Sequence, residues 1–232
     1  MNNASISRLI RNIVGGILLL SCTSAYAQFN IKVGYNGAYV NSAKANQIID
    51  AFNDTRSTES GKIRLSKFLH GLELGARYKV TENLRFDIGL SALNASNETE
   101  GVILSPTETI SSEWRTTLTN YFVGIESQYG FFGLGANIGL QKLRYQNNTS
   151  LSSEKRNIVD QTELNSRFYL NLESTSSNMS FALRPYVSIA WKPYNVGALE
   201  LDLNPLQSAP TEVFEEDLLV YGLTILFFNG PQ

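Results

Sequence analysis

Long stretches of this sequence alternate strictly between apolar and polar side chains. From Leu72 to Val80, every second residue is apolar, and the residues between them are Glu, Gly, Arg and Lys. Alternation with a period of two is typical of β-strands that have one apolar and one polar face. Eight segments show the pattern, approximately residues 28–40, 63–80, 84–97, 113–129, 131–146, 179–192, 196–206 and 217–228.

The links between these segments alternate between short and long. Tight turns are expected at 81–83, 129–130 and 193–195, and longer links rich in Ser, Thr, Asn and Glu at 41–62, 98–112, 147–178 and 207–216. In an up-and-down barrel this alternation places every short turn at one rim and every long loop at the other, as in outer-membrane barrels. The sequence therefore predicts an all-β fold, an eight-stranded antiparallel up-and-down transmembrane β-barrel.

One segment is less regular than the others. In 113–129, Tyr121 keeps the phase of the apolar face, whereas Trp114 and Leu118 fall out of step with it. An extra residue in one strand shifts the phase of its side chains, so we expect a β-bulge near Thr119. Within the link 147–178, residues 168–172 are expected to prolong a strand beyond the membrane.

The N-terminus has the features of a secretory signal peptide. Two arginines precede an apolar run at 13–20, and an Ala-Tyr-Ala stretch ends at Ala27. The run is far shorter than the roughly 20 residues of a membrane-spanning helix, so we expect a cleaved leader at 1–27 and a barrel domain at 28–232. Cys22 is the single cysteine and lies in this leader. Lipidation of Cys22 is the alternative to cleavage at Ala27.

Composition excludes several classes of function. The formal charge is −2 with no basic cluster of the kind that binds nucleic acid. The segment after the leader contains no cysteine, no Cys/His zinc spacing, no glycine-rich phosphate loop and no Gly-x-Ser-x-Gly elbow. We therefore expect no metal and no cofactor.

Alternation alone does not distinguish a membrane barrel from a soluble lipocalin-like barrel. Lipid on the outside is favoured because the polar face mixes charged residues with glycines, which suits a narrow lumen. Aromatic residues also gather near the predicted short turns, as in an interfacial girdle: Phe29, Tyr78, Phe86, Tyr129, Phe132, Trp191, Tyr194 and Phe227. A second girdle is expected at the other rim from Tyr39, Phe68, Trp114 and Phe181.

These motifs resemble those of a known family. The runs at 71–80, 83–90 and 133–140, with a last strand that ends on Phe227-Phe228, are similar to the small outer-membrane β-barrels that include outer membrane protein X and the membrane domain of outer membrane protein A. The resemblance covers the whole mature chain. It implies a monomer in the outer membrane of a Gram-negative bacterium, in contact with outer-membrane lipid and lipopolysaccharide. These motifs describe an architecture and not an activity.

The polar face predicts a charged interior. It contains residues of both signs: Lys32, Glu73, Arg77, Lys79, Arg85, Asp87, Glu126, Arg184, Lys192, Glu200 and Asp202. Eight strands leave no room for a free water channel, and an unpaired buried charge is costly. We expect a salt-bridge network that plugs the lumen, with Glu73 and Arg77 paired to neighbouring strands. A gated ion path is the alternative.

Two further groups of residues are candidates for chemistry. His70 is the single histidine, and barrel enzymes that modify lipid A use a histidine with serine or acidic partners. Ser66 lies four residues away along a strand, about 13 Å, which is too far for a hydrogen bond, so His70 is expected at the lipid–water boundary. The second group comprises Glu212, Glu215, Glu216 and Asp217, which are expected to be solvated, with a divalent cation as the alternative.

The sequence therefore favours a non-enzymatic outer-membrane barrel with a structural, envelope-maintenance or surface-interaction role. Binding is expected through the loops 41–62 and 147–178. The alternatives are a porin-like channel for small solutes and a lipid A-modifying enzyme.

Overall fold

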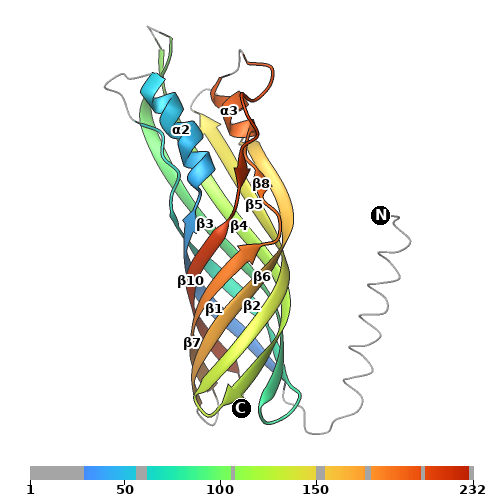
Figure 1. Cartoon of the computed structure of the whole chain (residues 1–232). Helices are drawn as coiled ribbons and strands as arrows, with labels where there is room; N and C mark the ends of the chain where they lie inside the picture. The colour runs from blue at the N-terminus through green and yellow to red at the C-terminus, as the bar shows by residue number, and fades with distance from the viewer. Residues whose placement is uncertain are drawn as a thin grey trace, which may run out of the picture.

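The computed structural model is a closed barrel of eight antiparallel strands (Figure 1). It describes residues 29–55, 62–105, 108–149, 155–175, 179–204 and 207–229, so the predicted leader lies outside the described residues. The strand order round the barrel is β1-β10-β7-β6-β5-β4-β3-β2. The strands are β1 Phe29–Asn41, β2 Phe68–Lys79, β3 Leu84–Ser105, β4 Glu108–Tyr129, β5 Phe132–Thr149, β6 Arg156–Thr175, β7 Met179–Ala190 and β10 Leu219–Asn229. The predicted fold class is confirmed.

Two helices and a small sheet lie at one end of the barrel, which we call the head end (Figure 1). Helix α2 (Ala43–Thr55) follows β1, and helix α3 (Ala198–Leu203) lies between β7 and β10. Strands β8 (Tyr194–Asn195) and β9 (Glu215–Glu216) pair with each other beside α3. None of the helices in the described ranges has the length and hydropathy that a bilayer crossing requires.

The predicted strand at 196–206 is wrong. These residues contain α3, and the missing barrel strand is β6, which lies inside the predicted link 147–178. Leu199 and Leu203 alternate with polar residues, but they are also four residues apart, so both lie on the buried face of a helix. The pattern is ambiguous because a spacing of four fits both periods.

This correction changes which connections lie at each rim of the barrel. Residues 193–195 lie at the head end, in the connection between β7 and β10, and the opposite rim has the end of β6 and the start of β7 instead. The other two short turns are where they were predicted, and Gly130 adopts a positive φ of 59° in the β4–β5 turn, a conformation that glycine favours. The predicted loop 98–112 is largely strand, because β3 and β4 continue to Ser105 and Glu108.

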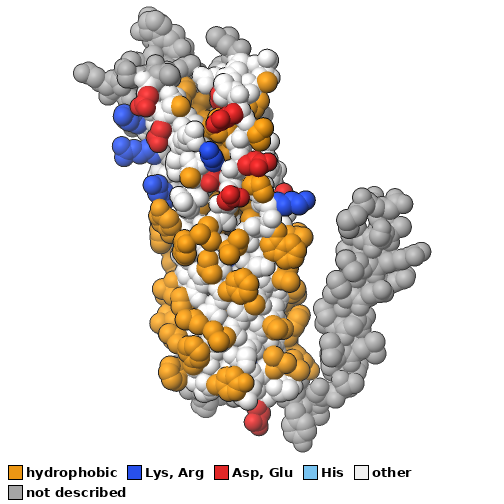
Figure 2. Space-filling view, in the orientation of Figure 1, with side chains coloured by type: hydrophobic (Ala, Val, Ile, Leu, Met, Phe, Trp, Pro, Cys, Tyr) orange, Lys and Arg blue, Asp and Glu red, His pale blue; other side chains and the backbone are white. Residues whose placement is uncertain are grey.

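Apolar side chains cover the outside of the barrel over the half away from the head (Figure 2). Ile31, Leu74 and Ile138 are 53%, 46% and 52% exposed. Charged side chains are concentrated above this belt, toward the head end (Figure 2). The alternative of a soluble lipocalin-like barrel is wrong, since such a barrel would place its apolar face inside, whereas the apolar side chains of the belt are outside.

Above the belt the polarity of the barrel wall inverts. Trp114 and Leu118 are 1% and 4% exposed and point into the barrel. The pairing of β4 with both neighbours runs without a shift through this region, so the bulge predicted near Thr119 is wrong. The phase of β4 is constant, and what changes is the interior, from polar at the belt to apolar in the head.

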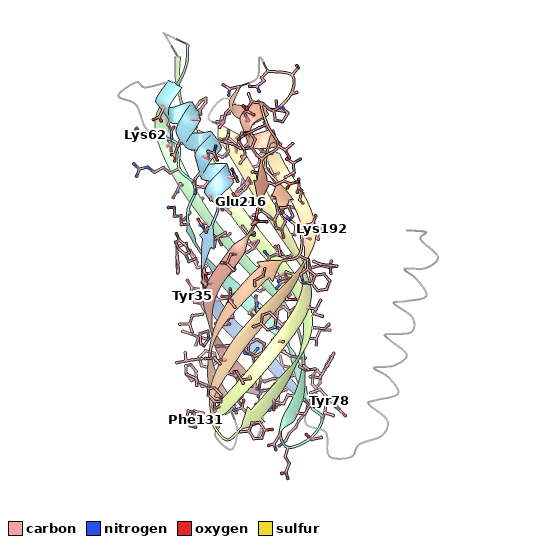
Figure 3. The ribbon with its side chains drawn as sticks, in the orientation of Figure 1. Tyr35, Lys62, Tyr78, Phe131, Lys192 and Glu216 are labelled. Atoms are coloured by element: carbon pink, nitrogen blue, oxygen red, sulfur yellow. The ribbon has the colours of Figure 1, made fainter. Side chains whose placement is uncertain are left out.

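The aromatic residues at the barrel ends partly follow the prediction. Phe29 pairs with Tyr78, and Phe86, Tyr129, Phe132 and Phe227 lie at the same short-turn end. Figure 3 labels Tyr78 and Phe131 at this end, opposite Lys62 and Glu216.

Four aromatic positions differ from the prediction. Trp191 lies at the head-end boundary, where its backbone N–H donates to the Leu164 carbonyl, because the strand it ends was assigned the wrong direction. For the same reason Phe181 lies at the short-turn end, with its ring centroid 5.5 Å from that of Phe227. Trp114 and Tyr194 are buried in the head.

Candidate functional site

The lumen at the level of the belt is filled by one connected network of ion pairs. Its nine residues come from six strands: Lys32 on β1, Glu73 and Arg77 on β2, Arg85 and Asp87 on β3, Glu126 on β4, Arg167 and Glu173 on β6, and Arg184 on β7. Their side chains are at most 6% exposed. A buried charge needs a partner of opposite sign, and each of the nine has one.

Several contacts of this network cross the lumen. Arg184 donates to Asp87 at 2.9 Å and to Glu126 at 2.7 Å, which links β7 to β3 and β4. Arg77 donates to both carboxylate oxygens of Glu173 at 2.7 and 3.1 Å, a bidentate pair between β2 and β6. Such pairs have a fixed geometry, so they tie opposite walls of the barrel together.

Aromatic rings stack on the arginines of this network. The Arg167 guanidinium carbon is 5.0 Å from the centroid of Phe122 and 4.2 Å from that of Tyr186. Arg184 lies 4.3 Å from the centroid of Tyr169. These cation–π contacts fill the volume that the ion pairs leave and further restrict the cations.

Glycines on the inner face make room for the large side chains. A Cβ added at Gly75 would lie 2.6 Å from Cε of Lys32, and one at Gly89 would lie 2.7 Å from Cζ of Phe122. The alternation of glycine with charged residues therefore reflects the narrow lumen, as the sequence suggested.

The structure brings together seven of the eleven residues predicted for the interior network. The other four lie elsewhere: Lys79 is half-buried at the short-turn end, Lys192 is exposed, and Glu200 and Asp202 belong to α3. Lys192 was placed inside because the strand predicted at 179–192 extends two residues beyond the end of β7, and Glu200 and Asp202 because 196–206 was predicted as a strand. Asp202 instead pairs with Arg156 of β6.

Sequence reasoning missed Arg167 and Glu173. Both lie on β6, which was assigned to a loop, although Leu164, Phe168, Leu170 and Leu172 carry an alternation that could have identified it. The partners expected for Glu73 and Arg77 on neighbouring strands are only partly found. Glu73 pairs with Lys32 on the adjacent β1, but Arg77 pairs across the lumen.

A polar layer lies between this network and the head. Asn36 donates to Ser91 and accepts a hydrogen bond from the Tyr186 hydroxyl, at 2.9 and 3.0 Å. Asn165 donates to Ser188, which donates to Gln141.

The head above this layer is closed by an apolar plug. It is formed by barrel residues and by α2, α3 and the segment before β10: Ala38, Val40, Leu69, Leu93, Trp114, Leu118, Leu143, Tyr145, Ile48, Ile49, Phe52, Leu199, Leu203, Phe214 and Leu218. These side chains are at most 8% exposed. The lumen is thus blocked twice, by ion pairs at the belt and by apolar packing in the head.

Glu216 attaches α2 to the plug. Its carboxylate accepts hydrogen bonds from the backbone N–H groups of Ala43, Lys44 and Ala45 at 2.8–3.0 Å. This caps the helix N-terminus, where unpaired donors and the helix dipole favour a negative charge. Burial raises the pKa of Glu216, although the three N–H groups lower it.

The acidic residues near Glu216 do not form a common cluster with it. Glu215 and Asp217 are exposed on either side, and within the described ranges no three His, Cys, Asp or Glu side chains converge as metal ligands do. Glu216 is therefore not simply solvated, because its carboxylate accepts hydrogen bonds from the first residues of α2.

His70 lies on the outer surface of β2. Its ring stacks on Tyr35 with centroids 6.1 Å apart, and it pairs in register with Gly37 and Asn94 at the upper edge of the belt. The Ser66 hydroxyl donates to the Phe68 carbonyl instead of to His70.

An apolar outer belt around an ionised lumen defines the class of small membrane-spanning β-barrels. No protein-family model matches the sequence, and neither does any curated protein sequence. Among solved structures, the fold is similar to that of Ail, the attachment invasion locus protein of Yersinia pestis, in complex with the heparin analogue sucrose octasulfate. This comparison has 12% identity and a TM-score of 0.50 and covers 88% of this chain and 97% of that chain.

Two further structures match less closely. Ail without the analogue has 12% identity and a TM-score of 0.45, with 87% and 96% of the two chains covered. Neisserial surface protein A has 10% identity and a TM-score of 0.41, with 88% and 97% covered.

Proposed function

We propose that this chain is a monomeric, non-enzymatic protein of a Gram-negative outer membrane, exported by a leader that is cleaved after Ala27. In this proposal the barrel anchors the protein in the membrane, and the head, formed by α2, α3 and residues 191–204 and 207–218, binds a partner outside the cell. The observation that carries it is the double closure of the lumen by nine connected charges and an apolar plug. A barrel closed in this way can hold a surface structure in place but offers no route for solute.

Conductance in planar bilayers tests the closed lumen against the channel alternative. We expect the purified barrel to give no single-channel steps. Ion passage would require several buried pairs to separate at once, and each separated pair leaves uncompensated charges. Steps in the wild-type protein that change in size in Glu73→Gln would support a channel and contradict the proposal.

The binding surface differs from the two loops first expected. The loop 41–62 contains α2, whereas most of 147–178 is the wall strand β6. The head therefore replaces 147–178 as the proposed binding surface. The complex of Ail with a heparin analogue concerns Ail; for this chain it supports only the general proposal that a barrel of this fold binds ligands at its surface.

Contact with lipopolysaccharide is proposed just above the belt. Lys142 and Arg144 share the single carboxylate of Asp160, at 2.7 and 3.2 Å, so this group keeps an excess positive charge. The hydrogen bond from Lys142 lowers the pKa of Asp160. Lys142 is two residues above the apolar Leu140, the height at which lipid phosphates would lie.

Lipid A analysis tests the absence of enzymatic activity. We expect mass spectra of lipid A to be the same from cells that express the wild-type chain, the His70→Ala variant or neither. A change in acylation that requires the wild-type chain and disappears in His70→Ala would establish the enzyme alternative.

A further inference from the structure

A cavity of ≈ 570 Å³ lies in the head between α2 and α3. One wall is the α2 face that carries Gln47, Ile48, Ala51 and Phe52. The opposite wall comes from the end of α3 and from residues 211–214. Figure 1 shows the two helices side by side at the head end, so the cavity is on the side of the molecule that the proposed function places outside the cell.

The walls are held in place by contacts within the protein. Glu200 accepts hydrogen bonds from the backbone N–H and the hydroxyl of Thr211, both at 2.8 Å. The Val196 N–H donates to the Phe214 carbonyl at 2.9 Å, and Glu216 fixes the start of α2. The cavity is thus preformed, and a ligand would not have to order it, which favours binding.

The cavity has an apolar floor and a polar rim. Ile48, Phe52 and Phe214 are 5%, 8% and 6% exposed and are continuous with the plug. The polar part of the lining comes from Gln47, Glu200, Asn204, Thr211 and Glu212, of which Gln47, Thr211 and Glu212 are exposed. Polar groups beside an apolar surface, in a volume between about 300 and 1,000 Å³, fit a small organic ligand that has both a charged and an apolar part.

The charge of the surrounding segments restricts the ligand. Residues 42–55, 191–204 and 207–218 carry eight carboxylates and two lysines, a formal charge of −6. The Glu200 carboxylate is already occupied by Thr211, whereas Glu212 is exposed at the rim. Since potentials of one sign attract ligands of the other, this surface disfavours anions and favours cations.

We propose that the cavity binds a small organic cation with an apolar body. The apolar part would rest on Ile48, Phe52 and Phe214, and the cationic group would lie at the rim beside Glu212. The inference rests on the proposed function, because it names the class of ligand for the head. A preference for cations would also distinguish this chain from a barrel that binds polyanions.

Binding can be measured on the folded full-length mature protein in detergent by saturation-transfer NMR. The probe is benzyltrimethylammonium, and benzenesulfonate is the anionic control of similar size. We expect the cation to bind with a dissociation constant of about 1 mM or lower and the sulfonate not to bind. Binding of both probes with equal affinity, or of neither, would overturn the inference.

Variants locate the site. Ala51→Trp fills the cavity from an exposed position of α2 and should abolish binding. Glu212→Gln should weaken binding by up to about fivefold, the range of an exposed ion pair, and Glu212→Arg should weaken it further. Asp50→Asn makes the same charge change on α2 outside the cavity lining and should have a smaller effect than Glu212→Gln.

Unchanged affinity in both Ala51→Trp and Glu212→Arg would contradict the site even if the cation binds elsewhere. If Ala51→Trp does not fold, as judged by heat-dependent electrophoretic mobility, the Glu212 variants still decide. The binding assay does not depend on where the protein is located in the cell. Failure of this inference is therefore distinguishable from failure of the proposed surface location.

Discussion

Arg184 shows how a single buried charge can hold the barrel together. It contacts Asp87 and Glu126 at once, and its own side chain is 1% exposed. Arg184→Leu would leave two carboxylates short of a partner, and breaking a buried pair in this way typically costs about 3–5 kcal/mol. We expect a loss of this size in the free energy of unfolding, measured by urea titration in lipid vesicles.

The matched control is Arg115→Leu on β4. Arg115 has one ion pair, to Glu113, and its side chain is 37% exposed. An exposed pair contributes about 0–1 kcal/mol, so this variant should unfold close to the wild type. Equal destabilisation by both variants would show that the buried network has no special role in stability.

Gly222 illustrates a second effect at the residue scale. The ring of Tyr186 lies over this glycine, where a Cβ would overlap it, and the Tyr186 hydroxyl donates to Asn36 at 3.0 Å. Gly222→Ala should displace the ring and cost about 1–3 kcal/mol, the usual penalty of overpacking.

A double-mutant cycle tests the cause of this effect. Tyr186→Leu removes the ring, so it should cost less in the Gly222→Ala background than in the wild type. Costs that add without interaction would mean that the ring does not respond to the new methyl group.

The residues that face the lumen could be predicted from the sequence wherever the strand was correctly placed. Lys32, Glu73 and Asp87 lie in segments with clean alternation, and the inward face follows from the period alone. The ion-pair partner of each charged residue could not be predicted from the sequence. Contacts across the lumen, such as that of Arg77 with Glu173, depend on the closure and tilt of the whole barrel. Local periodicity contains no information on these.

At the scale of elements, α2 depends on a carboxylate that is remote in sequence. Glu216→Ala removes the acceptor for three N–H groups, and loss of a helix cap costs about 1 kcal/mol. We expect α2 to open more often, so that limited proteolysis cuts within 43–55 several times faster than in the wild type. The barrel itself should remain folded.

Glu215→Ala is the control for this experiment, since Glu215 is the exposed neighbour on the same strand. Its digestion pattern should match the wild type. Faster cleavage in Glu215→Ala than in Glu216→Ala would contradict the capping role.

Elements were hardest to predict in the head. The residues of α3 were predicted as a strand because a spacing of four fits both a helix and a strand. The strand β6 was missed because the outward face of its head half is polar, whereas the outward face of its other half is apolar. Leu164 faces outward near lipid height, but Asp160 and Thr162 above it face water. A strand whose surroundings change along its length has no single apolar face.

At the scale of the whole molecule, the barrel consists of two parts with opposite polarity on one continuous set of strands. At the belt the outside is apolar and the inside charged, whereas in the head the inside is apolar and the outside charged (Figure 2). The out-of-phase Trp114 and Leu118 are the sequence signal of this change. It was interpreted as a bulge because a single environment was assumed for the entire strand.

Together with the short turns at the opposite rim, this division predicts which end of the molecule is outside the cell. The mature chain is expected to have no cysteine, so single-cysteine variants can be labelled selectively. Lys62 lies at the head end and Glu82 in the turn between β2 and β3, and both are exposed (Figure 3). A membrane-impermeant maleimide should label Lys62→Cys on intact cells and Glu82→Cys only after the outer membrane is permeabilised.

The orientation follows from the barrel architecture, because outer-membrane barrels keep their short turns in the periplasm and their longer connections outside the cell. The cost of moving the charged head back across the bilayer then keeps it on that side. The turn at 80–83 carries one charged side chain, Glu82, whereas the head carries a formal charge of −6 on α2, α3 and their flanking segments alone. Once the head is folded over its apolar plug, its charged exterior cannot lie in hydrocarbon, so the belt fixes the barrel in the membrane with the head on one side. Labelling of Glu82→Cys on intact cells, with Lys62→Cys protected, would reverse the orientation and with it the proposed surface role.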